Sequence, residues 1–389
     1  MIAALLVMDS GGIGDAPDAT AFGDHGASTI EHALARFPLP LPNLARMGLA
    51  ELIGLAGTPP VPLEGACARV HPRARGKDTL AGHWEMMGEI VAEPFRTYPD
   101  GFPAEVVGRL ERAFGRPILG NRAASGTAII EELGEEHMRT GRPIVYTSAD
   151  SVLQIACHED VVPLATLYAW CKAARAIMSG PHRVGRIIAR PFTGTPRAFV
   201  RTAHRHDYAI APSPGIFTER MAQAGVHCEA VGKIWDIFSG FGFPEPHPSR
   251  SNQHGLEQTT DLARQWRDAE RAFIFTNLVE FDSHYGHRRD PVGYARALAE
   301  LDAAVPTLLE ALGPQGVLFV TADHGCDPTL SGSDHTREDV PLLAAGSRLR
   351  PGRLKDRDTL ADIGATLGEA LRVPFPPVGH SFWHDLTDV

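Results

Sequence analysis

The fold class is decided near the N-terminus, where residues 2–9 read IAALLVMD. Seven apolar residues without alternation are typical of a strand buried on both faces, as in a parallel sheet. The run is too short to span a bilayer and has no basic segment of the kind that begins a secretory signal. We therefore predict a central strand over Ile2–Met8, with Asp9 at its carboxyl end.

Further short, β-rich apolar runs predict more buried strands. These runs are Ile144–Tyr146, Gly185–Ala189, Val226–Val231, Phe273–Val279, Val317–Thr321 and Pro341–Ala344. Helical patterns lie between many of them, for example at Glu257–Arg271 and Pro291–Leu312. Alternating strands and helices predict an α/β fold with a largely parallel sheet.

Polar side chains follow three of these strands. Asp9 follows the first run, Asp282 follows the run that starts at Phe273, and Asp323 and His324 follow the run that starts at Val317. In open α/β sheets ligands bind at the carboxyl ends of the strands. We therefore expect these side chains to meet at one site.

The candidate ligands suit divalent cations that handle phosphate, which take hard oxygen ligands with imidazole added. The predicted set is three carboxylates and three imidazoles: Asp9, Asp282, Asp323, His287, His324 and His335. Three carboxylates against two divalent cations leave about one positive charge for a phosphoryl group. A lone Asp or His is more often a cap or a satisfied polar residue, and we expect His83 and His284 to lie outside the ligand set.

Thr79 is the candidate nucleophile. Asp78 predicts the N-cap of a helix, and Leu80, Trp84 and Met87 have helical spacing, so Thr79 would lie in the first turn. A helix N-terminus favours an alkoxide or a phosphate. From the helix signals alone, the interpretation of Thr79 as part of the helix cap is preferred to that of a nucleophile.

Composition limits the protein class. The chain has 389 residues, a length that favours two domains. It has no low-complexity linker, so we expect the second domain to be an insertion into the first. The net charge of −10 and the absence of a basic run argue against nucleic-acid binding. Five cysteines without a CxxC pair indicate free thiols in a reducing compartment, and we expect a cytoplasmic protein that binds no membrane.

Long motifs give a family resemblance over nearly the whole chain. They read VMDSGGIG at 7–14, GKDTLAGHWEMMG at 76–88, GNRAASGT at 120–127, YTSADSVLQ at 146–154, GRIIARPF at 185–192, RHDY at 205–208, DSHYGHRRD at 282–290 and DHGCDPTLSGSDHTR at 323–337. With these motifs the sequence resembles the bacterial phosphopentomutases (phosphodeoxyribomutases) of the alkaline phosphatase superfamily.

The resemblance implies interconversion of ribose 1-phosphate and ribose 5-phosphate, and of the 2-deoxyribose analogues. It implies two Mn²⁺ ions, with Mg²⁺ or other divalent ions as substitutes, and a sugar bisphosphate as activator. The threonine that matches Thr79 carries a phosphate, and the sugar passes through a bisphosphate. By matching position, Asp9, Asp323 and His324 would hold one metal, and Asp282, His287 and His335 would hold the other.

The family architecture implies an alkaline-phosphatase-like core at 1–92 and 212–389, with a smaller α/β cap domain inserted at 93–211. The implied contacts to the pentose phosphate are Ser148, Asp150, Val152, Arg186, Ile188 and Arg201 in the cap, and Lys233 in the core. Arginine and lysine would neutralise a phosphate, and a carboxylate would accept hydrogen bonds from ribose hydroxyls.

Four positions depart from the family pattern without touching a ligand or the nucleophile: Gly11, Ala81, Trp235 and Cys326. Rival functions are a phosphatase of the same superfamily, a cofactor-independent phosphoglycerate mutase and a non-catalytic sugar-phosphate binder. The cap motifs favour the mutase over the phosphatase, since a mutase must keep water from the phosphothreonine. The complete ligand set argues against a binder. The sequence leaves the oligomeric state open.

Overall fold

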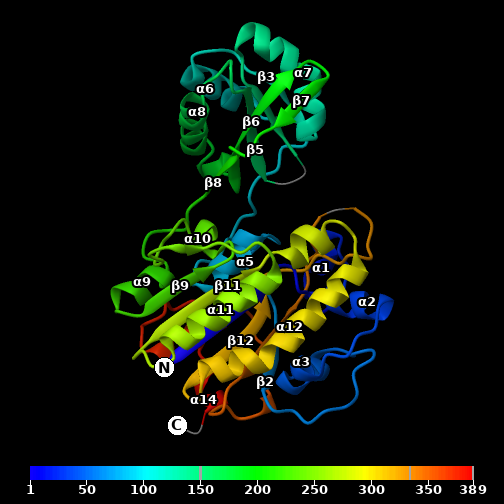
Figure 1. The fold of residues 1–389 in the computed structure, drawn as a ribbon, viewed down its shortest axis with the longest axis vertical. Coiled ribbons are helices and arrows are strands. Elements are labelled where there is room, and N and C mark those ends of the chain that lie inside the picture. The colour runs from blue at the N-terminus through cyan, green and yellow to red at the C-terminus, as the bar shows by residue number, and fades with distance from the viewer. Residues whose placement is uncertain (149–150, 333, 388–389) are drawn as a thin grey trace. The chain divides into compact units, whose positions relative to one another are not determined.

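The structure is a computed structural model that describes residues 1–148, 151–332 and 334–387. The chain divides into two compact units, each with its own sheet (Figure 1). The first unit comprises Met1–Pro94 and Ala211–Val389, and the second comprises Phe95–Ile210. The functional roles expected for a core and an inserted cap stay predictions.

The sheet of the first unit has eight strands in the order β10-β9-β11-β1-β12-β13-β2-β14. Their bounds are β1 Ile2–Met8, β2 Ala66–Val70, β9 His227–Val231, β10 Pro246–His247, β11 Ala272–Leu278, β12 Gly316–Ala322, β13 Val340–Ala345 and β14 Gly352–Arg353. Only β13 runs antiparallel to its neighbours β12 and β2. The expected α/β fold with a largely parallel sheet is confirmed.

Three central strands position the candidate site. Every residue of β11, β1 and β12 is buried, as expected for strands covered on both faces. Both outer strands pair in parallel with β1, and the register sets Met8 opposite Leu278 on one side and opposite Ala322 on the other. The carboxyl ends of the three strands are therefore level with one another.

Helices cover the sheet of the first unit. Their bounds are α1 Ala19–Phe22, α2 Thr29–Arg36, α3 Pro42–Met47, α4 Leu49–Leu52, α5 Thr79–Met86, α9 Phe217–Gln223, α10 Ile234–Ile237, α11 Asn252–Trp266, η2 Phe281–Gly286, α12 Pro291–Leu312, α13 Ala361–Leu371 and α14 Trp383–Leu386. The long helices α11 and α12 lie side by side against β11, β1 and β12 (Figure 1). The expected helix Pro291–Leu312 is confirmed, with Asp290 as its N-cap.

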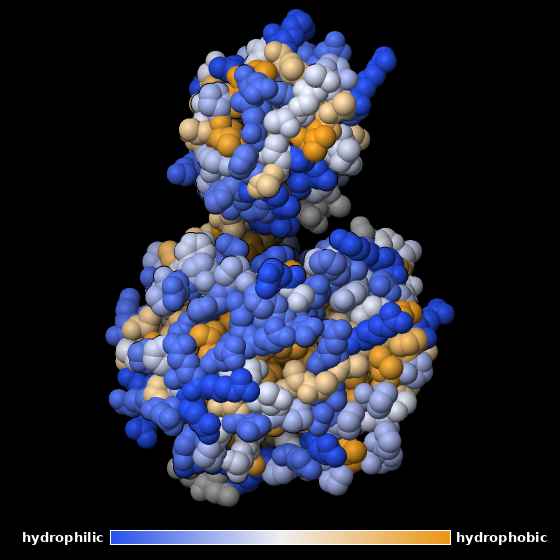
Figure 2. Space-filling model, in the orientation of Figure 1, coloured by the Kyte–Doolittle hydropathy of each residue, from blue (hydrophilic) through white to orange (hydrophobic). Residues whose placement is uncertain are grey.

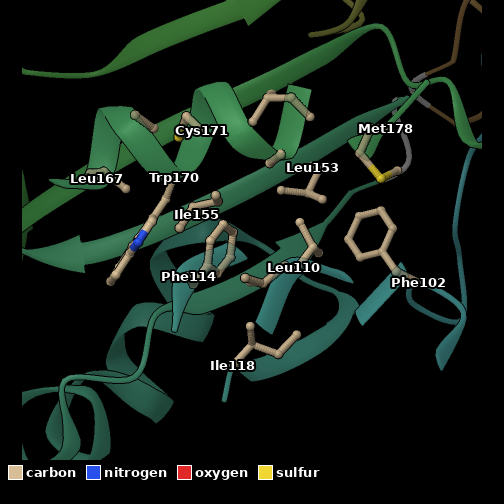
Figure 3. Close-up of a cluster of buried hydrophobic side chains, with 14 of the residues drawn as sticks. Phe102, Leu110, Phe114, Ile118, Leu153, Ile155, Leu167, Trp170, Cys171 and Met178 are labelled. Carbon is tan, nitrogen blue, oxygen red and sulfur yellow. The ribbon is translucent and has the colours of Figure 1, made fainter. Parts of the chain in front are cut away.

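The second unit has a six-stranded mixed sheet in which β3-β4-β5-β6-β7 are neighbours and β8 also pairs with β6. Its strands are β3 Leu119–Ala123, β4 Ile144–Thr147, β5 Val152–His158, β6 Arg186–Thr195, β7 Ala198–Arg201 and β8 His206–Ala209. Its helices are α6 Ala104–Phe114, α7 Gly126–Thr140, α8 Leu164–Ile177 and the short η1 Gly180–His182. A dry core lies between the sheet and helices α6 and α8, where Leu153 and Ile155 of β5 meet Leu110 and Trp170 (Figure 3).

Several expected segments have wrong bounds. The strand expected at Gly185–Ala189 is β6, which continues to Thr195. The helix expected at Glu257–Arg271 is α11, which begins earlier and ends at Trp266. The Ser251 hydroxyl caps its start by accepting from the His254 N–H at 3.1 Å, and this cap fixes where the helix begins. The strand that starts near Phe273 ends at Leu278, so Asp282 lies in the π-helical turn η2 and not at the strand end itself.

The surface drawn in Figure 2 is mostly hydrophilic, with scattered hydrophobic residues. Among the described residues, Val200 is the one large hydrophobic residue counted as exposed. Across the same residues, no helix combines the length and apolar character needed to cross a membrane. All five cysteines are free and buried, in agreement with the expected absence of disulfides.

Candidate metal centre

The six candidate ligands gather into two groups at the carboxyl edge of the large sheet. Within each group, one ligand atom from every member lies within 4.8 Å of the others. The first group is Asp9, Asp323 and His324, and the second is Asp282, His287 and His335. The His324 and His335 rings lie with their centroids 4.1 Å apart, so the two groups are adjacent.

The first group is buried. Asp9 and Asp323 follow the neighbouring parallel strands β1 and β12, which brings their side chains together. The His324 Nε2 atom lies 3.5 Å from Asp9 Oδ1 and 3.4 Å from Asp323 Oδ2, and the three side chains are 0–3% exposed. Two carboxylates this close in a dry site repel each other unless a cation lies between them.

The second group is nearer to solvent. Asp282 lies between two imidazoles, with its Oδ2 3.2 Å from His287 Nε2 and its Oδ1 3.2 Å from His335 Nε2. The side chains are 13% exposed for Asp282, 15% for His335 and 31% for His287. This group is therefore the more accessible to a ligand from solvent.

Two histidine tautomers are set for metal binding. The Nδ1 of His335 lies 2.7 Å from the Lys77 carbonyl, and the Nδ1 of His324 lies 3.1 Å from the Gly325 carbonyl. A carbonyl only accepts, so each Nδ1 donates its proton and leaves the Nε2 lone pair directed into its group. Ordered in this way, both rings can coordinate a cation through Nε2.

The charges and unpartnered oxygens fit divalent cations. Asp323 Oδ2 and Asp282 Oδ1, one oxygen from each group, are buried and make no well-aligned hydrogen bond, although an imidazole nitrogen lies 3.2 Å from each of them. Burial raises the pKa of Asp282, but hydrogen bonds from His287 and His335 outweigh burial and hold that pKa well below its ordinary value. The hydrogen bond to Asp282 is the largest cause that raises the pKa of His287 to about 11. The second group thus stabilises positive charge, and the three carboxylates and three imidazoles of the two groups make the mixed set that Mn²⁺ or Zn²⁺ accepts.

Thr79 lies beside the first group, at the start of helix α5. The predicted helix N-cap is confirmed, since Asp78 Oδ1 accepts from the Ala81 N–H at 3.1 Å. The Thr79 hydroxyl donates to Asp9 Oδ1 at 3.1 Å and lies 3.5 Å from His324 Nε2. The first N–H groups of the helix and its dipole favour negative charge at this position.

His83 and His284 both lie outside the two ligand groups, as expected. The His83 ring is fully buried, whereas His284 is exposed. The His83 Nδ1 atom lies 2.9 Å from the Thr79 carbonyl and 3.2 Å from Asp323 Oδ2. The Asn277 amide donates to Asp9 Oδ2 at 3.1 Å and lies 3.4 Å from His83 Nε2. His83 and Asn277 therefore back the first group from the protein interior.

The residues implied as substrate contacts belong to both units. In the second unit, Val152 begins β5 and pairs with Arg186, which begins β6 on the same strand as Ile188. Ser148 follows β4, and Arg201 ends β7. Lys233 belongs to the first unit, where it precedes α10 with an exposed side chain. Asp150 lies outside the described residues.

The four residues that depart from the family pattern are all packed against neighbouring residues to some extent. A Cβ at Gly11 would lie 2.9 Å from the Ala322 Cβ, so the loop after Asp9 is tightly packed at this position. Cys326 is fully buried, and its Sγ accepts from Arg289 Nη1 at 3.8 Å. Ala81 is buried in the first turn of α5, and Trp235 is partly buried in α10.

Comparison with known proteins agrees with this metal-binding geometry. The model of the metalloenzyme superfamily matches residues 1–374, which defines the class of protein. The chain is 53% identical to the phosphopentomutase of Symbiobacterium thermophilum over 97% of its length and 96% of that protein. It is 49% identical to the phosphopentomutase of Deinococcus radiodurans, over 98% and 99% of the two chains. For the phosphopentomutase of Carboxydothermus hydrogenoformans the identity is 47%, over 98% of both.

The chain belongs to the phosphopentomutase family, and it is an enzyme of that class.

Proposed function

We propose that the enzyme interconverts ribose 1-phosphate and ribose 5-phosphate, and the 2-deoxyribose analogues, through a phosphorylated Thr79 and a sugar bisphosphate. The observation that carries this proposal is the position of the Thr79 hydroxyl, 3.1 Å from Asp9 Oδ1 and 3.5 Å from His324 Nε2. A hydroxyl at a helix N-terminus, beside ligands for a divalent cation, is suited to carry a phosphoryl group.

The proposed cofactors are two Mn²⁺ ions, held by the two ligand groups. When bound, such ions withdraw charge from phosphoryl oxygens. The protein's own part is to hold Thr79 at the start of α5, where free N–H groups and the helix dipole stabilise its phosphate. The His335 and His324 rings are held by carbonyls on their Nδ1 side, which keeps both Nε2 atoms directed inward.

The proposed cycle transfers one phosphoryl group at a time. The bond from Thr79 Oγ1 to phosphorus breaks as a new P–O bond forms to the free sugar hydroxyl, which gives up its proton to solvent. The sugar then carries two phosphates. In the return step Thr79 Oγ1 forms a bond to the phosphorus of the other phosphate, and the bond from that phosphorus to the sugar oxygen breaks. The freed sugar oxygen takes up a proton from solvent, which releases the isomeric monophosphate and restores the phosphoenzyme. A trace of sugar bisphosphate would load an unphosphorylated Thr79 by the same step.

We assign the catalytic role to the first unit and substrate contacts mainly to the second. The proposed contacts are Ser148, Asp150, Val152, Arg186, Ile188 and Arg201, with Lys233 from the first unit. Cationic side chains in this set are suited to the phosphate that is not being transferred, because guanidinium groups bind phosphate oxygens in a bidentate manner.

The test is a mutase assay on the full chain with Mn²⁺ and a trace of ribose 1,5-bisphosphate. We expect ribose 5-phosphate to give ribose 1-phosphate, and the intact protein to gain the mass of one phosphoryl group. Thr79→Val keeps the side-chain shape but removes the hydroxyl, so turnover should fall at least about a thousandfold. Thr79→Ser, which keeps a hydroxyl, serves as the matched control and should retain part of the activity and the mass gain.

Two results would contradict the proposal. Release of inorganic phosphate without ribose 1-phosphate would assign a phosphatase in place of a mutase. Full turnover by Thr79→Val would remove the role given to Thr79.

A further inference from the structure

The α7 face of the second sheet buries polar side chains as well as apolar ones. Along β5, Leu153 and Ile155 point into the dry core of Figure 3, so Gln154 between them points to the opposite face, toward α7. On that face the apolar cluster includes Ile129 and Ile130 of α7. Tyr146 of β4 also belongs to it. Buried polar groups in such a place are normally hydrogen-bonded.

The Tyr146 hydroxyl is an exception to that rule. The side chain is 0% exposed, and its hydroxyl makes no hydrogen bond within the part of the chain that the structure describes. The hydroxyl points at the beginning of helix α7, since a Cβ added to Gly126 would lie 2.6 Å from it. Burying a hydroxyl without a partner is unfavourable, so this group needs an acceptor that none of the described residues supplies.

The start of α7 lacks a side-chain cap. The helix has 15 residues, and its N-cap residue Ser125 makes no side-chain hydrogen bond to the first turn. The first N–H groups of a helix have no partner within the helix, and together with the dipole they favour an anion. The Tyr146 hydroxyl and these N–H groups thus offer donors at one place.

Arginines add positive charge beside this place. Arg190 donates through Nε to Gln154 Oε1 at 2.5 Å, and its Cδ would lie 3.7 Å from a Cβ at Gly126. Burial lowers the pKa of Arg190, and the nearby Arg205 and Arg201 lower it further. The protein therefore brings cations together here against their mutual repulsion.

Too few carboxylates oppose these cations. Among the described residues, Asp207 is the carboxylate that faces Arg190, and it is already paired with Arg205 at 2.6 Å and lies 3.8 Å from Arg186. Within the part of the chain that the structure describes, the guanidinium groups of Arg190, Arg201 and Arg205 face this one carboxylate, which leaves an excess of two positive charges. An anionic ligand would supply the missing charge.

We propose that the N-terminus of α7, the Tyr146 hydroxyl and Arg190 form an anion site that binds the phosphate group of the pentose phosphate. Arg186 and Arg201 are substrate contacts of the proposed function, and the new members are Tyr146, Arg190 and the helix start at Gly126. All the new groups are hydrogen-bond donors. They suit a phosphate monoester, because each of its oxygens can accept a hydrogen bond, and they do not suit a cation. The identity of the anion rests on the proposed function, while the anion site itself does not.

The test titrates full-length protein, freed of metal by a chelator, with ribose 5-phosphate in a calorimeter, and with ribose as the ligand that lacks the phosphate. We expect ribose 5-phosphate to bind and ribose not to bind. Tyr146→Phe should weaken binding on the order of tenfold, because one hydrogen bond to a charged acceptor is lost. Arg190→Gln should weaken it as well. Tyr98→Phe is the matched control, since the Tyr98 hydroxyl lies 3.1 Å from His182 Nδ1 in the same unit, and it should bind like the wild type.

A second measurement separates a ligand site from a structural role. Without ligand, Tyr146→Phe should unfold at no lower a temperature than the wild type, because its hydroxyl has no partner to lose. Unchanged binding by Tyr146→Phe, equal binding of ribose, or a marked drop in its melting temperature without ligand would each overturn the proposal. If Tyr146-dependent binding is found but the wild type shows no mutase activity with Mn²⁺, the anion site stands and the proposed function falls.

Discussion

The buried imidazole of His83 touches both parts of the chemistry without being a candidate ligand. It lies on α5, one turn after Thr79, with Nδ1 2.9 Å from the Thr79 carbonyl and 3.2 Å from Asp323 Oδ2. A carbonyl and a carboxylate only accept, so Nδ1 carries the proton and Nε2 is left to face the Asn277 amide. That amide in turn donates to Asp9. His83 is therefore a positioning residue for both carboxylates of the first group.

We expect His83→Phe to weaken Mn²⁺ binding about tenfold or more, because residues that orient metal ligands have effects of that size. Phenylalanine keeps the ring and its packing beside Phe275 but removes both nitrogens. Calorimetric titration of the metal-free protein with Mn²⁺ is the measurement. His284→Phe is the control, because the exposed His284 lies near the second group and contacts Ser283. Equal Mn²⁺ affinity of His83→Phe and the wild type would rule the role out.

At the scale of elements, the carboxyl edge of the large sheet depends on loops that are held together by one buried carboxylate. Glu338, 1% exposed, precedes β13 and accepts from the Gly14 N–H at 3.2 Å, in the loop after β1. It also accepts from the Thr29 N–H at 2.9 Å, at the start of α2, and from the Thr336 hydroxyl at 2.6 Å. The candidate ligand Asp9 directly precedes the first of these segments, and His335 directly precedes Thr336. Glu338 therefore helps to hold the loops that carry these two ligands.

Burial raises the pKa of Glu338 from 4.5 to about 7, although its hydrogen-bond donors oppose the shift. Between pH 4.5 and 7 this carboxyl has lost its proton in the unfolded chain but keeps it in the folded protein. Its contribution to the free energy of unfolding is therefore full below pH 4.5 and is lost as the pH rises through 7. A shift of this size corresponds to about 3 kcal/mol. Urea unfolding between pH 4.5 and 8 should therefore show the wild type losing about 3 kcal/mol relative to Glu338→Gln, which cannot titrate. Parallel pH profiles of the two proteins would show that Glu338 does not titrate in this range.

At the scale of the whole molecule, the chain has two units with separate sheets and cores. All six candidate metal ligands belong to the unit formed by Met1–Pro94 and Ala211–Val389. The unit Phe95–Ile210 has its own apolar core between its sheet and helices α6 and α8 (Figure 3). A ligand that binds only the folded form of one unit stabilises that unit by mass action.

Removal of metal should therefore lower the stability of the first unit selectively. At a free Mn²⁺ concentration about 100 times the dissociation constant, one bound ion contributes about 2.7 kcal/mol. Scanning calorimetry with Mn²⁺ and with excess chelator should show one transition that moves and one that does not. Asp282→Asn with Mn²⁺ provides the matched control and should move the same transition in the direction that the chelator does. Equal displacement of both transitions would contradict the assignment.

Much of the fold and of the metal centre could be predicted from the sequence. The continuous apolar run Ile2–Met8 required a doubly covered strand, and its abrupt end at Asp9 marked the site edge. Cap chemistry at Asp78 and the periodicity of Pro291–Leu312 fixed two helices, because these signals are local. The strand before Asp282 was expected to be longer than it is because the apolar run continues through Val279, past the end of β11 at Leu278.

The sequence by itself thus determined the chemistry of each ligand type. It also determined the strand ends at which the first ligands lie. Tertiary structure alone decided which polar residues lost contact with water: His83 behind Asp323, and Tyr146 and Arg190 beside Gly126. No local sequence pattern predicts these contacts. The physical reason is that burial and the direction of a side chain depend on segments far apart in the chain, whereas apolar runs and caps act over a few residues.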